Sequence, residues 1–216
     1  MPNWCVTNYV VEGEKKELDD LYQKMKGLQE MEQPLVENGF GQTWLGCLVQ
    51  SLGADPEDVG CRGNWDELER RDDTLRFDFW SDWSPSYDVI ELLREKYPSI
   101  RFYYRAIEPG NRLFQKNDSG GKYFPENIWA VMDGDDYFAA DKQEMLKMMK
   151  EKFDLPEHLS SLEEVESYIE ESEDHDFFCF AEFDLTNDEH DAFTAQLIRG
   201  IRNGDIKIET KSSEEE

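Results

Sequence analysis

Hydrophobic and polar residues alternate with a period of two in residues 75–81 and again in residues 100–106. Such alternation predicts half-buried β-strands. Between the two stretches, hydrophobic residues recur at a spacing of three and four, which predicts a helix with Pro85 as its first residue and an end before Pro98. We therefore expect a strand, a helix and a second, parallel strand of one sheet over residues 74–107.

The preceding residues supply the other elements of a small sheet. Residues 4–11 and 59–68 have the composition of strands, residues 14–29 form an amphipathic helical pattern, and residues 42–52 predict a short extra helix. This order is that of the ferredoxin-like βαββαβ fold, a four-stranded antiparallel sheet backed by two helices. We expect an α+β protein in which residues 1–122 form this domain, with 42–52 as a helical insertion.

Residues 123–216 predict an acidic α/β part packed on the first domain. Strands are expected at 128–132 and 177–185, and helices are expected to begin at Asp141, Ser161 and Thr186, each followed three positions later by a glutamate that completes a capping motif. The hydrophobic residues of the last helix are expected to face inward, and a short strand is expected after it. These residues are Phe193, Leu197, Ile198 and Ile201 of the helix and Ile206 and Ile208 of the strand.

The net charge of −27 is the outlying feature of the composition. Residues 1–122 hold 23 acidic and 15 basic residues, whereas residues 123–216 hold 27 and 8. Such a surface repels nucleic-acid phosphates and anionic membranes and favours a basic protein partner. No apolar run approaches the ~20 residues of a membrane helix, and four dispersed cysteines fit a reducing compartment. We expect a cytoplasmic protein with no cofactor.

Several tryptophan-containing motifs stand out in the first half. Trp4 follows Pro2-Asn3, Trp65-Asp66 follows Asn64, and Trp80-Ser81-Asp82-Trp83-Ser84-Pro85 leads into the predicted helix. With these motifs, residues 1–115 resemble the YubB-like family, whose members are carried on plasmids, phages and conjugative elements. The resemblance implies a ferredoxin-like domain and no catalytic assignment. Where the family has a Gly-Thr-Lys-Trp-Asp-like stretch, this chain has asparagine at position 64, so the lysine is missing.

The acidic segment of the second part is the leading candidate binding surface. Carboxylates held on an ordered helix can bind the basic surface of another protein and can imitate a phosphate backbone. We therefore expect non-catalytic protein–protein interaction, and, as a narrower form of it, nucleic-acid mimicry towards basic DNA-processing proteins. The alternative is an ordinary solvated acidic face. The candidate residues are Glu163, Glu164, Glu166, Glu170, Glu171, Glu173 and Asp174.

The runner-up is nucleic-acid or nucleotide binding on the sheet face opposite the helices. Arginines interleaved with aromatic residues on a four-stranded sheet are how RNA-recognition domains stack bases. The competing interpretation is that the second part covers this face and pairs its arginines with carboxylates. The residues expected on this face are Tyr9, Arg76, Trp80, Arg101, Tyr103 and Arg105.

Enzymatic chemistry has weaker support in the sequence. No phosphate loop, dinucleotide fingerprint, nucleophile elbow or zinc-protease helix is present, and the three histidines lie far apart. An enzyme that uses Asp82, Asp66 or the acidic cluster that begins at Asp133 stays open. That cluster has partial EF-hand spacing but lacks the central glycine, and a hairpin turn followed by a helix cap explains it equally. Its residues are Asp133, Asp135, Asp141 and Glu144.

Overall fold

A computed structural model describes residues 3–171 and 177–206 of the chain. Its helices and strands follow in the order β1 (Trp4–Glu12), α1 (Lys15–Gln29), α2 (Leu45–Ser51), β2 (Gly63–Arg70), β3 (Thr74–Asp82), α3 (Tyr87–Lys96), β4 (Arg101–Glu108), β5 (Leu113–Lys116), β6 (Ile128–Met132), β7 (Asp135–Ala139), α4 (Lys142–Phe153), α5 (Leu162–Glu170), β8 (Phe178–Glu182), β9 (Asp184–Leu185) and α6 (Asp188–Arg202).

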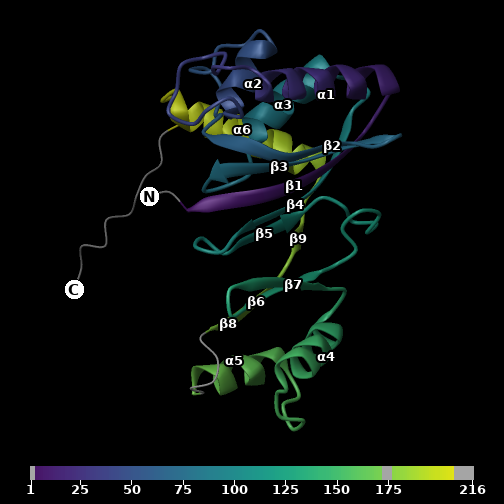
Figure 1. The fold of residues 1–216 in the computed structure, drawn as a ribbon. Coiled ribbons are helices and arrows are strands. Elements are labelled where there is room, and N and C mark those ends of the chain that lie inside the picture. The colour runs from purple at the N-terminus through teal and green to yellow at the C-terminus, as the bar shows by residue number, and fades with distance from the viewer. Residues whose placement is uncertain (1–2, 172–176, 207–216) are drawn as a thin grey trace, which may run out of the picture.

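The strands of the first half join two further strands in one sheet, in the order β2-β3-β1-β4-β5-β9 (Figure 1). Pairing is antiparallel from β2 to β5, whereas β5 and β9 pair in parallel. β3 and β4 therefore run in the same direction on either side of β1, as the sequence predicts. The expected α+β class is confirmed. The expected size of the sheet is wrong, because β5 and β9 extend it beyond β4.

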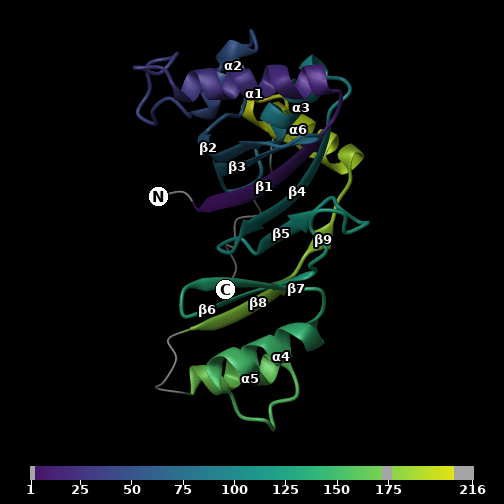
Figure 2. The same ribbon diagram turned by 45° about the vertical axis from the view of Figure 1, so that its right-hand side comes forward.

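Helices α1, α2, α3 and α6 cover one face of this sheet (Figures 1 and 2). The core beneath them contains the odd-numbered residues Leu75, Phe77 and Phe79 of β3, which are at most 1% exposed, together with Leu18 and Leu21 of α1. The rings of Phe77 and Phe79 stack with their centroids 4.9 Å apart. The alternation in the sequence thus marks the buried face of β3 correctly.

A second sheet, in the order β7-β6-β8, lies on the other side of the first (Figures 1 and 2). One of its faces packs on α4 and α5, through residues such as Met145 and Val165. Its other face meets the first sheet. There the ring centroids of Trp129 of β6 and Phe114 of β5 are 4.9 Å apart, and Phe183 packs beside them. The molecule therefore has four layers, with helices on the outside and two sheets between them.

The C-terminal part returns to the first sheet. The predicted strand 177–185 is divided into β8, which belongs to the second sheet, and β9, which pairs with β5, with the buried Phe183 between them. α6 then lies beside α3 in the helical layer and buries Asp191 and Ala195. The acidic part thus contributes to both halves of the molecule.

The contacts of α6 differ from those expected. Its N-cap is Asn187, whose Oδ1 accepts a hydrogen bond from the His190 N–H at 2.8 Å, and not Thr186. The expectation that its hydrophobic residues face inward is wrong for Phe193, Leu197 and Ile198, which are exposed. The reason is that the buried side of α6 holds a small residue and a carboxylate. Ile206 lies outside any strand, and Ile208 lies outside the described residues.

The other helix starts follow the sequence more closely. Asp141 accepts hydrogen bonds from the backbone N–H groups of residues 143 and 144, and Ser161 accepts one from residue 164, so the predicted starts of α4 and α5 are confirmed. α3 begins at Tyr87 and not at Pro85, which lies in the preceding turn, where its carbonyl accepts the Tyr87 N–H at 2.8 Å. That turn forms one wall of the site described below.

All four cysteines are free thiols, three of them buried. Within the part of the chain that the structure describes, no helix has the length and hydrophobicity needed to cross a membrane.

Candidate functional site

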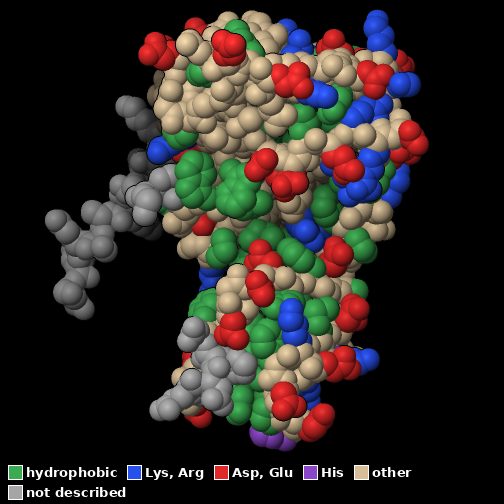
Figure 3. Space-filling model, in the orientation of Figure 1, with side chains coloured by type: hydrophobic (Ala, Val, Ile, Leu, Met, Phe, Trp, Pro, Cys, Tyr) green, Lys and Arg blue, Asp and Glu red, His purple; other side chains and the backbone are tan. Residues whose placement is uncertain are grey.

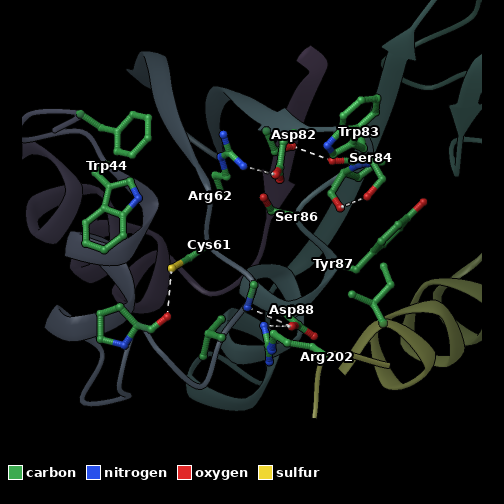
Figure 4. Close-up of a pocket in the computed structure, with 17 residues that line it drawn as sticks. Trp44, Cys61, Arg62, Asp82, Trp83, Ser84, Ser86, Tyr87, Asp88 and Arg202 are labelled. Carbon is green, nitrogen blue, oxygen red and sulfur yellow. Dashed lines mark hydrogen bonds and ion pairs between the residues drawn. The ribbon is translucent and has the colours of Figure 1, made fainter. Parts of the chain in front are cut away.

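A cavity of about 520 Å³ opens where β3 ends and α3 begins (Figure 4). Segments that are far apart in the sequence enclose it: the loop before α2, residues 56–62, the β3–α3 turn and the end of α6. We call it the motif pocket, because the tryptophan-containing motif forms one wall. Its lining residues are Phe40, Trp44, Pro56, Val59, Gly60, Cys61, Arg62, Ser81, Asp82, Trp83, Ser84, Pro85, Ser86, Tyr87, Asp88, Ile198 and Arg202.

Trp83 sits at the mouth of the motif pocket in a strained conformation. Its φ of 67° lies in the left-handed region, which a bulky residue rarely adopts. Its N–H donates to the carbonyl of Asn3 at 2.9 Å, and this bond holds the turn against the start of β1. Its side chain nevertheless remains 47% exposed. Backbone strain combined with a large exposed ring is typical of a functional position.

Asp82 lies between Trp83 and Arg62 at the same mouth (Figure 4). The Arg62 guanidinium is 3.5 Å from the carboxylate, and the arginine side chain is 57% exposed whereas that of Asp82 is 26% exposed. Burial raises the pKa of Asp82, and the neighbouring Arg62 opposes this effect. Asp82 is therefore a partly desolvated carboxylate with a long and loosely held ion pair.

The charged groups in the deeper wall of the pocket are already paired with one another. The Asp88 carboxylate, 2% exposed, lies 3.1 Å from Arg202 and 3.4 Å from Arg199, and it accepts the Gly60 N–H at 3.0 Å. Burial raises the pKa of the Cys61 thiol to about 11. The thiol is therefore protonated at neutral pH and is no activated nucleophile.

A shallower hollow of about 480 Å³ adjoins the motif pocket and shares Phe40 with it. Four large aromatic side chains surround the two openings with 39–47% of their surface exposed. Figure 3 shows hydrophobic side chains gathered at this edge, where β1 begins and β3 ends. We call these four residues the aromatic rim: Trp4, Phe40, Trp80 and Trp83.

Residues from each of the tryptophan-containing motifs line one of these two cavities. Trp4, Trp65 and Asp66 line the hollow, and Asp82, Trp83 and Pro85 line the motif pocket. Trp65 is 1% exposed, and its indole N–H finds no acceptor among the described residues. Lining residues of the motif pocket that are not among the site residues that the sequence predicts include Phe40, Arg62, Ile198 and Arg202.

The outer face of the first sheet differs from the expected platform. The prediction that Tyr9 lies on this face is wrong: Tyr9 pairs with Phe77 of β3, points to the helical side and is 2% exposed. Arg105 is covered, since its side chain lies 3.4 Å from Glu126 and 3.7 Å from the ring centroid of Phe138.

The other residues of that face are less uniformly covered. The Tyr103 ring packs edge-on against Tyr123, with centroids 5.1 Å apart, whereas Arg101 and Trp80 are exposed and Arg76 is half-buried. A polar cavity of about 680 Å³ on this face is lined by Arg76 and Arg105 and by the acidic residues Asp66, Glu67, Glu69 and Asp78. The acidic residues of this cavity outnumber its arginines, which disfavours the binding of a phosphate there.

The acidic candidates fall on α5 and just beyond it. Glu163, Glu164 and Glu170 are exposed on α5, Glu171 is its C-cap, and Glu166 is half-buried. Glu163 lies 3.3 Å from Lys142, and Glu164 accepts the Ser160 N–H at 2.6 Å. Glu173 and Asp174 lie outside the described residues.

The possible metal-binding cluster is separated into a turn and a helix cap. Asp133 and Gly134 have positive φ in the β6–β7 hairpin, Asp141 caps α4, and Glu144 accepts the Ala140 N–H at 2.8 Å. Asp135 lies 3.5 Å from the Tyr137 hydroxyl. Over residues 3–171 and 177–206, no group of three or more acidic, histidine or cysteine residues has the arrangement of a metal site.

Comparison with family models, with curated proteins and with solved structures gives no match. The resemblance to the YubB-like family therefore stays a prediction.

Proposed function

We propose that the protein is a non-catalytic module that binds a basic protein segment. The aromatic rim makes the contact, and the surplus carboxylates supply long-range attraction. The observation that carries this proposal is the exposure of four large aromatic side chains around two adjoining cavities. Exposed apolar patches of this kind mark interaction sites, and tryptophan contributes disproportionately to binding energy.

The charge of the site favours a basic partner. Asp66 lines the hollow and Asp82 lines the motif pocket, each among aromatic rings. Arginine and lysine side chains bind both carboxylates and aromatic faces. The net charge of −27 attracts such a partner at long range and repels nucleic acid. Nucleic-acid binding at the outer sheet face is less well supported, because Arg105 is mostly buried and paired with Glu126, and acidic residues outnumber the arginines in the cavity there.

Nucleic-acid mimicry is the narrower form of this proposal. Its support is that the carboxylates of α5 are carried by an ordered helix, so their spacing is fixed. A basic DNA-processing protein that binds the chain would then be released by duplex DNA. A partner that binds duplex DNA and this chain at the same time would contradict the mimicry while leaving the rim proposal intact.

Binding of a fluorescent nona-arginine peptide tests the main proposal. We expect saturable binding that weakens as salt is raised, because charge contributes to it. The double variant W80A/W83A, which leaves the net charge unchanged, should bind at least about tenfold more weakly. F193A removes a ring that is 65% exposed on α6 and lines neither cavity, so it should bind within about twofold of the wild type. Equal affinities of W80A/W83A and the wild type would refute the proposal.

For the fold, we propose that β1 to β4 with α1 and α3 form a ferredoxin-like unit. The antiparallel order β4-β1-β3-β2 and the crossover positions of the two helices support this assignment. β5 and β9 would then be additions to one edge, and α2 an insertion.

A further inference from the structure

The negative charge of Asp82 is only partly balanced by its neighbours. Its ion pair with Arg62 measures 3.5 Å, longer than the roughly 2.8 Å of a charge-assisted hydrogen bond. Burial disfavours its charged form, and an exposed tryptophan ring stands beside it (Figure 4). A better-placed cation would therefore stabilise the ionised carboxylate.

We propose that the motif pocket receives one basic side chain, an arginine or a lysine, of the bound segment. Its guanidinium or ammonium group pairs with Asp82 and lies against the ring of Trp83, and Arg62 moves away to admit it. This inference rests on the proposed function and deepens it, since it names the chemical group that the site takes and the residue that selects it.

The shape and charge of the pocket fit this occupant. Its volume of about 520 Å³ exceeds that of a single side chain, and its aromatic walls, Phe40, Trp44 and Tyr87, suit the methylene stem of arginine or lysine. The second pocket carboxylate, Asp88, is already paired with two arginines and a backbone N–H. Of the described lining residues, Asp82 is thus the carboxylate that is free to change partner.

Arg62 occupies the position of the incoming cation. Its side chain is 57% exposed, so it loses little by turning into solvent. Removing Arg62 should therefore strengthen the binding of a cation. It should weaken the binding of an anion such as a nucleotide phosphate, which would use Arg62 as its partner. The direction of the effect of R62A distinguishes the two ligand classes.

The test is a titration with N-acetyl-arginine methylamide, followed by the indole N–H resonance of Trp83 in NMR spectra of the whole chain. We expect a saturable shift, at least about tenfold weaker binding to D82N, and about threefold or stronger tightening in R62A. The matched control is R71A, since Arg71 is 54% exposed, pairs with Glu69 and lies at the opposite end of the β2–β3 hairpin. It changes the net charge equally and should leave the affinity within about twofold.

Three outcomes would overturn the inference: weaker binding in R62A, unchanged binding in D82N, or equal tightening in R62A and R71A. Because the Arg62 side chain is exposed, R62A should fold normally, and its result decides the question even if D82N folds poorly. The small ligand also separates this inference from the proposed function. If W80A/W83A loses nona-arginine binding but the wild type does not bind N-acetyl-arginine methylamide, the proposed role of the aromatic rim stands and the inference about the pocket is rejected. N-acetyl-arginine binding without rim-dependent peptide binding would retain the pocket alone.

Discussion

Trp83 combines an unfavourable backbone conformation with an exposed side chain, so its effects on stability and on binding can be separated. At a φ of 67°, alanine keeps the strain whereas glycine does not. We predict that W83G is about 1 kcal/mol more stable than W83A in chemical denaturation, while both bind nona-arginine equally weakly. If W83A were the more stable variant, the turn would not be strained and this argument for a functional role would fail.

Asp78 gives the stability a dependence on pH. Burial raises its pKa, and the charges of Glu67 and Asp66 act in the same direction. The folded state therefore keeps this proton to a higher pH than the unfolded chain does, so the contribution of Asp78 to stability falls as pH rises through that window. D78N should raise the free energy of unfolding at neutral pH by on the order of 1 kcal/mol or less.

The same variant should lose its advantage in acid. Below the unfolded pKa of about 3.9, Asp78 is protonated in both states and D78N should match the wild type. Denaturation curves at a series of pH values would show this, and an advantage that persists in acid would assign the effect to packing instead of charge.

Individual residues show what alternation in a sequence can and cannot predict. The period of two places Leu75, Phe77 and Phe79 correctly, because the residues between them, Arg76 and Asp78, are charged. The same pattern fails for Tyr9, because β1 has hydrophobic residues at both odd and even positions and lies between two neighbouring strands. The assignment of Tyr9 required the register, which only the three-dimensional pairing supplies.

At the scale of elements, Asp88 is, over the described residues, one of two α3 residues whose ion pairs attach α6, the other being Arg94. D88A would leave the Gly60 N–H without its acceptor and would free Arg199 and Arg202 of α6. We predict a loss of about 2 kcal/mol in stability and faster amide hydrogen exchange in α6. D188A is the control, since Asp188 is 73% exposed and pairs with Arg94, so its cost should stay below about 1 kcal/mol. Equal costs would show that Asp88 contributes no more to the attachment of α6 than the exposed Asp188 does.

α5 carries negative charge where it opposes helix stability. Glu170 ends the helix and Glu171 caps it, with no basic residue in the last turn, and acidic groups at this end interact unfavourably with the helix dipole. The variant E170K/E171K should therefore be about 1 kcal/mol more stable. It should also associate several-fold more slowly with nona-arginine at low salt, with an unchanged dissociation rate. Stopped-flow kinetics would measure both rates, and faster dissociation would place α5 in direct contact with the peptide.

Elements with local chemical signals are the ones that the sequence predicts well. The capping residues Asp141 and Ser161 mark α4 and α5 because their hydrogen bonds are made within four residues. The division of residues 177–185 between two sheets has no such signal, since the apolar pattern runs on through Phe183. The exposed stripe of α6 has none either, because periodicity locates an apolar face without showing what covers it.

For the whole molecule, the layered arrangement explains why only part of the site could be predicted. Trp80 to Pro85 are adjacent in sequence and form a recognisable motif. Phe40, Arg62 and Arg202 reach the same cavity from other segments, and α6 arrives there only after the chain has built the second sheet. Contacts of this sequence separation depend on the fold and leave no pattern along the chain.

A hydrogen-exchange footprint of the bound basic peptide tests the central claim most directly. The whole chain would be measured with and without saturating nona-arginine. The aromatic rim predicts slowed exchange in residues 40–44, 62–66 and 80–88, with α5 unchanged. Protection confined to α5, with no change around Trp80 and Trp83, would contradict it.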